Sequence, residues 1–113
     1  MKLFAGLRKM REFERLQLPF LTSLVDFDII IEIGYAEEQL QPLTLKRLLL
    51  LNPSSRTTVR RRLASLVEKG VVIRHKDTED QRSSLLTVSS SSLKLLTKYG
   101  SFMTSIFKVS LLD

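Results

Sequence analysis

At 113 residues the chain is long enough for one domain with a single core, and its formal net charge is +6. A basic chain favours a polyanion as partner, although many small soluble proteins are basic. The absence of cysteine excludes disulfides, thiolate catalysis and zinc held by cysteine. No apolar run approaches the ~20 residues of a membrane span, and the N-terminal segment lacks the apolar core of a secretory signal. We therefore expect a cytoplasmic protein without a membrane partner.

Two long helices are predicted in the first third of the chain. Residues 3–17 combine apolar positions at helical spacing with basic ones, which predicts an amphipathic helix. This helix could lie on an anionic membrane surface, but packing against the core or against a second subunit is favoured. Over residues 20–38 apolar side chains recur at steps of three and four, with Asp26 away from the centre of the stripe. The side chains expected in the core are those of Phe20, Leu24, Phe27, Ile31 and Tyr35.

Two short helices around a turn are predicted next, after a break or a short strand. Thr44 is a favourable N-cap for a helix over residues 45–51, and an Asn-Pro-Ser turn follows. Ser55 caps a second helix over residues 56–69, which Gly70 ends as a left-handed glycine would. This order of parts predicts a helix-turn-helix.

The second of these helices has an apolar side and a basic side. The side expected to face the core consists of Val59, Leu63, Leu66 and Val67. Arg60, Arg61 and Arg62 are adjacent, so steps of 100° spread them over the whole polar arc. Arg61, with Thr57 beside it, is best aimed at base edges, whereas Arg60 and Arg62 are better placed for phosphates. Such a row is equally typical of a solvated face, but the neighbouring turn and hairpin favour contact with DNA.

A β-hairpin is predicted after this helix. Residues 71–74 and 85–88 are strand-like, and the polar segment 75–84 joins them. An arginine at such a tip can enter a narrow minor groove, and Arg82 is placed for this role with Asp80 two residues earlier to hold its guanidinium. The acids of the loop suggest a calcium site, but the glycine and the distal glutamate of a calcium loop are missing.

Together these elements predict a mainly α fold with a small β-hairpin, a winged helix-turn-helix with flanking terminal helices. A single domain is expected, with an N-terminal helix at residues 1–18, a winged helix core at 20–88 and a C-terminal helix at 89–113. Four serines at 89–92 resemble a flexible linker, but a cap is favoured because apolar residues recur helically after them. In such folds the second helix of the motif enters the major groove, and the hairpin reaches the backbone or the minor groove.

The segment TTVRRRLASLVEKGVVIRHKDTEDQRSSLLTVS resembles the recognition helix and wing of the MarR family of bacterial transcription regulators. In that family the helix ends in a basic residue and glycine, and an Asp-x-Arg signature follows in the wing. The matching residues here are Glu68-Lys69-Gly70 and Asp80-Gln81-Arg82, and the similarity covers about residues 20–100. It implies a homodimer that is built from the terminal helices, binds a pseudo-palindromic operator and usually represses transcription.

The resemblance also implies roles for individual residues. Arg82 would be the minor-groove arginine and Asp80 its positioning acid. The major-groove helix would include Ser55, Thr57, Thr58, Arg60 and Arg61. The chain departs from the family in its shorter terminal helices and in a run of four leucines at 48–51, of which at least one should face outward. Whether a small-molecule effector binds is left open.

The expected functional residues fall into two sets. Double-stranded DNA is expected to contact Ser55, Arg56, Thr57, Thr58, Arg60, Arg61, Arg62, Lys76, Asp80 and Arg82. A second subunit is expected to contact Leu3, Leu7, Met10, Leu93, Leu96, Met103 and Phe107.

Three other functions are weighed against a DNA-binding regulator. An enzyme is disfavoured because the four glycines are isolated and no catalytic triad or carboxylate pair is suggested by spacing. No cofactor and no metal site is expected. A winged helix used for protein contact is the main rival, because the leucine run would then be the working surface. RNA is disfavoured as a ligand, because the deep, narrow A-form major groove excludes such a helix.

Overall fold

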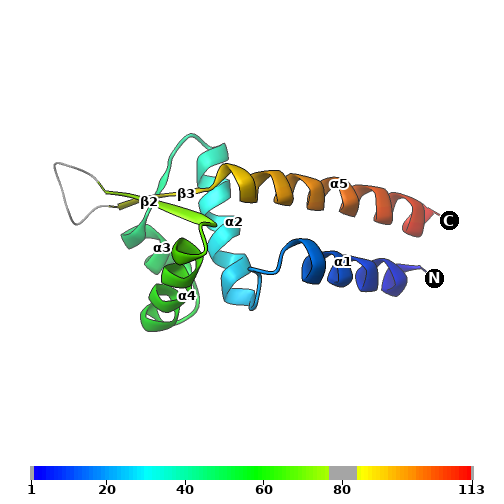
Figure 1. Ribbon diagram of the computed structural model, residues 1–113, viewed down its shortest axis with the longest axis horizontal. Coiled ribbons are helices and arrows are strands. Elements are labelled where there is room, and N and C mark those ends of the chain that lie inside the picture. The colour runs from blue at the N-terminus through cyan, green and yellow to red at the C-terminus, as the bar shows by residue number, and fades with distance from the viewer. Residues whose placement is uncertain (1, 77–83, 113) are drawn as a thin grey trace. The chain divides into compact units, whose positions relative to one another are not determined.

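The computed structural model describes residues 2–76 and 84–112, with side chains as far as Lys108. Within these ranges it contains five helices and three strands, which confirms the predicted mainly α fold with a small β element (Figure 1). The chain forms two compact units, one from Met1–Leu21 with Ser90–Asp113 and the other from Thr22–Ser89. None of the helices in the described ranges combines the length and the apolar character that a membrane span requires.

The two chain ends form a pair of helices. α1 (Leu3–Gln17) runs alongside α5 (Ser90–Leu112), and the bounds of α1 are those predicted (Figure 1). The helices come close at Gly6, where an added Cβ would lie 3.0 Å from Cε1 of Phe107. Farther along, the ring of Phe13 stacks on Phe102 with centroids 4.8 Å apart.

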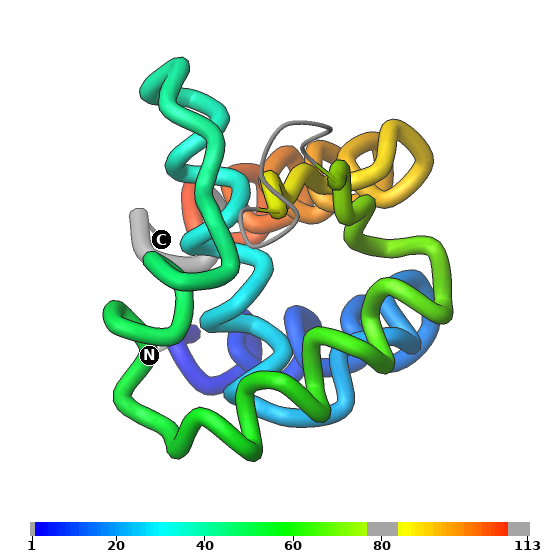
Figure 2. The backbone as a smooth tube through the Cα atoms, turned by 90° about the vertical axis from the view of Figure 1, so that its left-hand side faces the viewer, coloured from blue at the N-terminus to red at the C-terminus, as the bar shows by residue number. Residues whose placement is uncertain are grey.

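The Thr22–Ser89 unit begins with α2 (Leu24–Glu38), followed by β1 (Leu43–Thr44). α3 (Leu45–Leu51) and α4 (Arg56–Glu68) then follow each other around a turn (Figure 2). β2 (Val72–Lys76) and β3 (Ser84–Val88) complete an antiparallel sheet with the order β1-β3-β2. The core of the Thr22–Ser89 unit includes the fully buried side chains of Ile29, Ile33, Leu48, Val59, Leu66, Val72 and Leu86.

The helix-turn-helix forms where the local signals predict it. Thr44 Oγ1 accepts a hydrogen bond from the backbone N–H of Arg47 at 3.1 Å, and Ser55 Oγ accepts one from the N–H of Thr58 at 3.2 Å. Both are N-cap bonds that satisfy a free helical donor. Gly70 has φ +75°, the left-handed conformation expected of the residue that ends α4.

The predicted facing of α2 is wrong for three of the five side chains expected in the core. Leu24, Ile31 and Tyr35 are 73%, 55% and 59% exposed. Phe20, which precedes α2, is buried as predicted, and Phe27 is half-buried. The buried face contains Asp26, Ile29, Ile30 and Ile33. Because α2 is apolar almost all round, its pattern gives little contrast between faces, and a buried ion pair of Asp26 with α4 accompanies the opposite orientation.

Candidate nucleic-acid interface

α4 presents a polar face that is opposite its packed side. Val59, Leu63 and Leu66 are buried as predicted, and Val67 is half-buried. The side chains of Arg60 and Arg61 are exposed. Exposed with them are Arg56, Thr57, Ala64 and Glu68. The apolar contacts therefore turn two of the three adjacent arginines to solvent.

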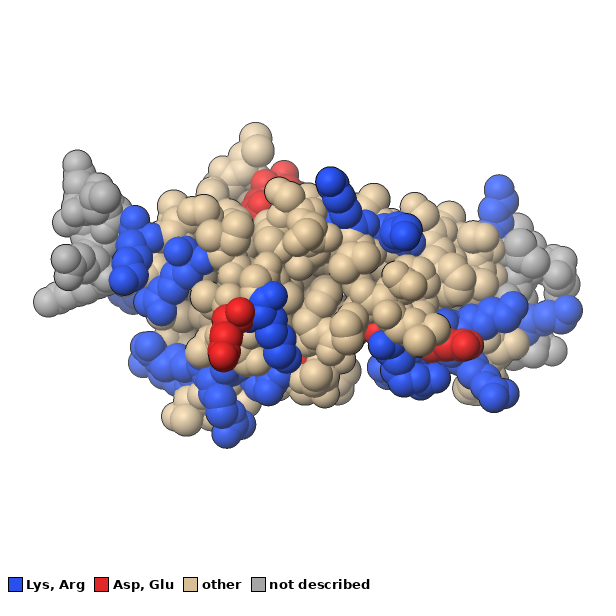
Figure 3. Space-filling view, viewed as in Figure 1, with Lys and Arg blue, Asp and Glu red and all other residues tan. Residues whose placement is uncertain are grey.

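Further basic residues of the same unit extend this surface. Lys46 and Arg47 on α3 and Arg74 and Lys76 on β2 are exposed. Figure 3 shows Lys and Arg side chains gathered over this part of the unit. Cations grouped in this way attract a polyanion.

A groove of about 310 Å³ lies where α3, α4 and β2 meet. Arg60 and Arg74 contribute to its lining from α4 and β2. The remaining lining residues are Leu45, Leu63, Ala64, Val67 and Glu68. The groove thus places two guanidinium groups beside a mainly apolar floor.

At the start of α4 the hydroxyl groups bond to one another. Ser55 Oγ donates to Thr58 Oγ1 at 2.9 Å in addition to capping the helix. In the preceding turn, Asn52 Oδ1 accepts from the N–H of Ser54 at 2.9 Å. Ser55 and Thr58, two of the expected DNA contacts, therefore already serve to fix the helix start. Ser55, Arg56 and Thr57 are exposed, and Thr58 is half-buried.

The described part of the hairpin is held by side-chain bonds between its strands. Arg74 Nε donates to Ser84 Oγ at 2.9 Å, and His75 Nε2 lies 2.7 Å from Thr87 Oγ1. Lys76 is the last described residue of β2 and is exposed. The other expected wing residues, Asp80 and Arg82, lie outside the described residues.

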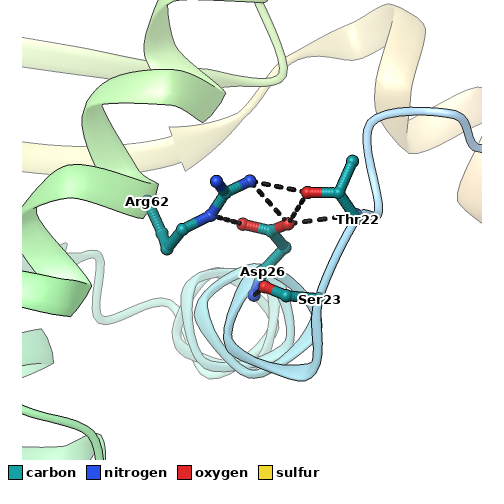
Figure 4. Close-up of polar contacts among 4 residues, drawn as sticks. All are labelled: Thr22, Ser23, Asp26 and Arg62. Atoms are coloured by element: carbon teal, nitrogen blue, oxygen red, sulfur yellow. Dashed lines mark hydrogen bonds and ion pairs between the residues drawn. The ribbon is translucent and has the colours of Figure 1, made fainter.

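Arg62 does not share the solvent-facing position of its two neighbours, which corrects the expected facing of this residue. Its Nε and Nη2 donate to Oδ1 and Oδ2 of Asp26 at 2.7 and 2.9 Å (Figure 4). Nη2 also donates to Thr22 Oγ1 at 2.7 Å. The interaction joins residues 36 positions apart, so no local pattern predicts it, although an aspartate on an apolar helix is a signal of a buried partner.

Asp26 is completely buried, yet its hydrogen bonds favour the charged form. Besides Arg62, the backbone N–H and the hydroxyl of Thr22 donate to Oδ2 at 3.0 and 2.7 Å. Burial raises the pKa of Asp26, but the hydrogen bonds from Arg62 and Thr22 outweigh it, so the pKa lies below its ordinary value. The hydrogen bond between Arg62 and Asp26 also raises the pKa of Arg62.

Only some of the residues expected at a subunit interface are exposed and so able to contact a second subunit. Leu7, Leu93 and Met103 are exposed, whereas Leu3, Leu96 and Phe107 are half-buried. Met10 is 4% exposed and lies within its own chain, which corrects its assignment to the interface.

Comparison with solved structures decides the fold type. The MepR–DNA complex of S. aureus matches with a TM-score of 0.73 and 20% identity, over 99% of this chain and 90% of that one. The transcriptional regulator Tm0710 of Thermotoga maritima matches with a TM-score of 0.67 and 22% identity, over 86% of this chain and 66% of that one. MarR itself matches with a TM-score of 0.59 and 21% identity, over 94% of this chain and 78% of that one. The chain has the MarR-like winged helix fold.

This MarR-like fold confirms the architecture that the wing signature and the helix-turn-helix predicted. No protein-family model and no curated protein sequence matches the chain. The likeness is therefore one of structure at low sequence identity. Within that fold, α4 corresponds to the second helix of the helix-turn-helix and the β2–β3 hairpin to the wing.

Proposed function

We propose that the protein is a sequence-specific double-stranded DNA-binding regulator of transcription that acts as a repressor. α4 reads the major groove, and the wing at residues 75–84 reaches the minor groove. One observation carries the proposal: the second helix of the helix-turn-helix exposes Arg56, Arg60 and Arg61, and Arg61 lies on the side opposite its buried apolar residues. The similarity to the MepR–DNA complex supports it.

The exposed side chains suggest a division of roles. Arg61, with Thr57 one turn earlier, is assigned to base edges, because a guanidinium can bond to O6 and N7 of guanine together. Arg56 and Arg60 are assigned to phosphates, with Lys76 at the wing. Arg62 is left out of this set because Asp26 holds its guanidinium.

For the wing we propose that Arg82 enters the minor groove and that Asp80 orients it. Arg82→Ala should then reduce affinity most at sites flanked by A·T-rich sequence, where the groove is narrow. Asp80→Asn should also weaken binding, although it removes a negative charge near DNA. Simple electrostatics predicts the opposite sign, so tighter binding of Asp80→Asn would show that the acid does not position Arg82.

Selection of bound sequences from a random duplex pool, followed by affinity measurements at several salt concentrations, tests the proposed function. A preferred half-site with a steep loss of affinity at higher salt is expected, since phosphate contacts release counterions. Two half-sites in inverted order would reflect a dimer. The absence of any enriched sequence would contradict the proposal.

A second candidate function is a winged helix that binds a protein. The exposure of Leu50 and Leu51 on α3, with Leu40 at 88%, favours this alternative and confirms that leucines of the run face outward. The arginines of α4 argue against it, because charged residues are depleted from the centre of protein interfaces. Duplex binding that is undetectable even at low salt would support the alternative.

A further inference from the structure

Arg62 lies next to the proposed base-reading residue but is directed into the unit (Figure 4). We propose that the cluster of Thr22, Asp26 and Arg62 sets the rotation of α4 about its own axis and so determines which arginine meets the base edges. Arg62 is then a positioning residue of DNA recognition rather than a phosphate ligand. The inference rests on the proposed function and adds a determinant of its specificity.

The contact between Arg62 and Asp26 has a defined direction. Arg62 donates through two nitrogens to the two oxygens of a single carboxylate, so the planar groups fix each other's orientation. The buried side chains of α4 are those of Val59, Leu63 and Leu66, and apolar burial is not directional. Because successive residues of a helix are 100° apart, a rotation by one step would replace Arg61 at the base-facing position by a neighbour. The ion pair supplies an angular restraint against this rotation.

The carboxylate of Asp26 is anchored at the start of α2. Asp26 lies in the first turn of α2, where its backbone N–H donates to Oγ of the N-cap Ser23 at 3.3 Å. Thr22 donates to the carboxylate through both its backbone N–H and its hydroxyl, and the same hydroxyl accepts from Arg62. The carboxylate is therefore held by the start of α2 independently of α4. Because the position of this carboxylate is fixed, α4 must adopt the rotation that brings Arg62 to it.

The guanidinium of Arg62 is not free to bind a phosphate instead. Its side chain is 24% exposed, and two of its nitrogens are bonded within the cluster. Movement of the guanidinium to DNA would leave the carboxylate of Asp26 completely buried without its cation. A buried charge without its partner is strongly unfavourable.

The decisive variant removes both charges together. In Asp26→Leu/Arg62→Met the net charge is unchanged, and apolar side chains of similar volume fill the space, a replacement that buried ion pairs tolerate. Affinity is measured for the selected site and for an unrelated duplex over a range of salt. The ratio of the two affinities should fall about tenfold or more, the size of one lost bidentate base contact. The salt dependence should keep its slope, because the removed Arg62 is bonded to Asp26 and contributes no phosphate contact.

Two further variants make the result specific. Thr22→Val removes only the hydroxyl of the cluster and should reduce the affinity ratio by less than the double variant does. Arg60→Gln removes a proposed phosphate contact, so its salt slope should fall by about one unit while the affinity ratio is kept. An unchanged ratio in a folded double variant would overturn the proposal, as would a slope lowered by about one unit, which would identify Arg62 as a phosphate ligand.

A measurement without DNA separates this inference from the proposed function. Amide hydrogen exchange is compared between the wild type and Asp26→Asn. Exchange in α4 should become faster relative to exchange in the β2–β3 pair, because α4 loses its directional link to α2. If the wild type shows no preferred duplex, the proposed function fails, whereas unchanged relative protection of α4 would overturn the positioning link itself.

Discussion

Arg60, Arg61 and Arg62 are adjacent in the chain but have different surroundings. The first two are exposed on the polar face of α4, and the third is bonded to a buried aspartate. A row of like charges in a sequence therefore does not have one function. On a helix, the 100° step between residues and the partners available at each angle determine what each side chain does.

Arg61 and Arg60 should respond differently to truncation. Arg61→Ala should cost about 1–3 kcal/mol at the preferred site and relax its sequence preference, as the loss of a bidentate base contact would. Arg60→Ala should weaken all duplexes similarly and lower the salt slope by about one unit. Binding curves on the selected site, on single-base variants of it and on an unrelated duplex separate the two effects. An unaltered site preference in Arg61→Ala would show that another residue faces the bases.

Acid should weaken the Asp26–Arg62 pair in a defined pH range. The pKa of Asp26 is lowered in the folded chain, so its contribution to stability is complete above the unfolded value of about 3.9 and is lost as pH falls through the folded value. In urea unfolding, the wild type should be more stable than Asp26→Asn at neutral pH, by about 3 kcal/mol if the asparagine leaves Arg62 unpaired. This difference should shrink below about pH 4. A difference that stays constant down to pH 2 would contradict the role of the charged carboxylate.

At the scale of elements, the sequence predicted those features that depend on neighbouring residues. The caps at Thr44 and Ser55 and the left-handed Gly70 are local, and the helices they delimit form within one residue of the expected bounds. The facing of α2 could not be predicted, because both of its sides are apolar and the ion pair that accompanies the observed orientation joins residues 36 positions apart. Of the expected DNA contacts, Ser55, those on α4 and Lys76 lie in the described part of the chain, and the wing residues Asp80 and Arg82 remain predictions.

The pairing of α1 with α5 leads to a prediction about Tyr99. Its hydroxyl donates to Glu14 Oε2 at 2.7 Å, and burial together with Glu14 raises the pKa of Tyr99 to about 12. Because the pKa of Tyr99 is raised in the folded chain, the contribution of Tyr99 to stability is complete below the unfolded pKa of about 10. It is lost as pH rises from there to about 12. In Tyr35→Phe, Tyr99 is the remaining one of the two tyrosines, so phenolate absorbance should report its midpoint near 12.

The matched variant for this titration adds Glu14→Gln to Tyr35→Phe. The midpoint of Tyr99 should then move down from about 12, because the negative charge of Glu14 no longer favours the neutral phenol. Circular dichroism of the same samples shows whether the helices are intact at each pH. An identical midpoint in both variants, with the helices intact, would mean that burial alone accounts for the shift.

At the scale of the whole molecule, the charge is distributed unevenly between the two units. The chain ends, residues 1–21 and 90–113, contain eight Lys or Arg and three Asp or Glu, a difference of +5 out of the total of +6. Residues 22–89 contain ten basic and nine acidic residues, a difference of +1. The net charge is therefore a poor guide to the proposed DNA-binding surface. The exposure of three arginines on α4 indicates this surface better than the net charge does.

The proposed reading of an inverted repeat requires two copies of the chain. The chain ends expose Leu7, Leu93 and Met103, which would be covered in a dimer. Light scattering at micromolar concentration should give twice the chain mass of 13.0 kDa.

Leu93→Glu should shift the protein to the monomer, because a charge would be buried at the interface. Leu40→Glu is the control, since Leu40 is 88% exposed in the other unit and its replacement should leave the dimer intact. A wild type that stays monomeric at all accessible concentrations would remove the support for reading an inverted repeat, and equal effects of the two substitutions would exclude Leu93 from the interface.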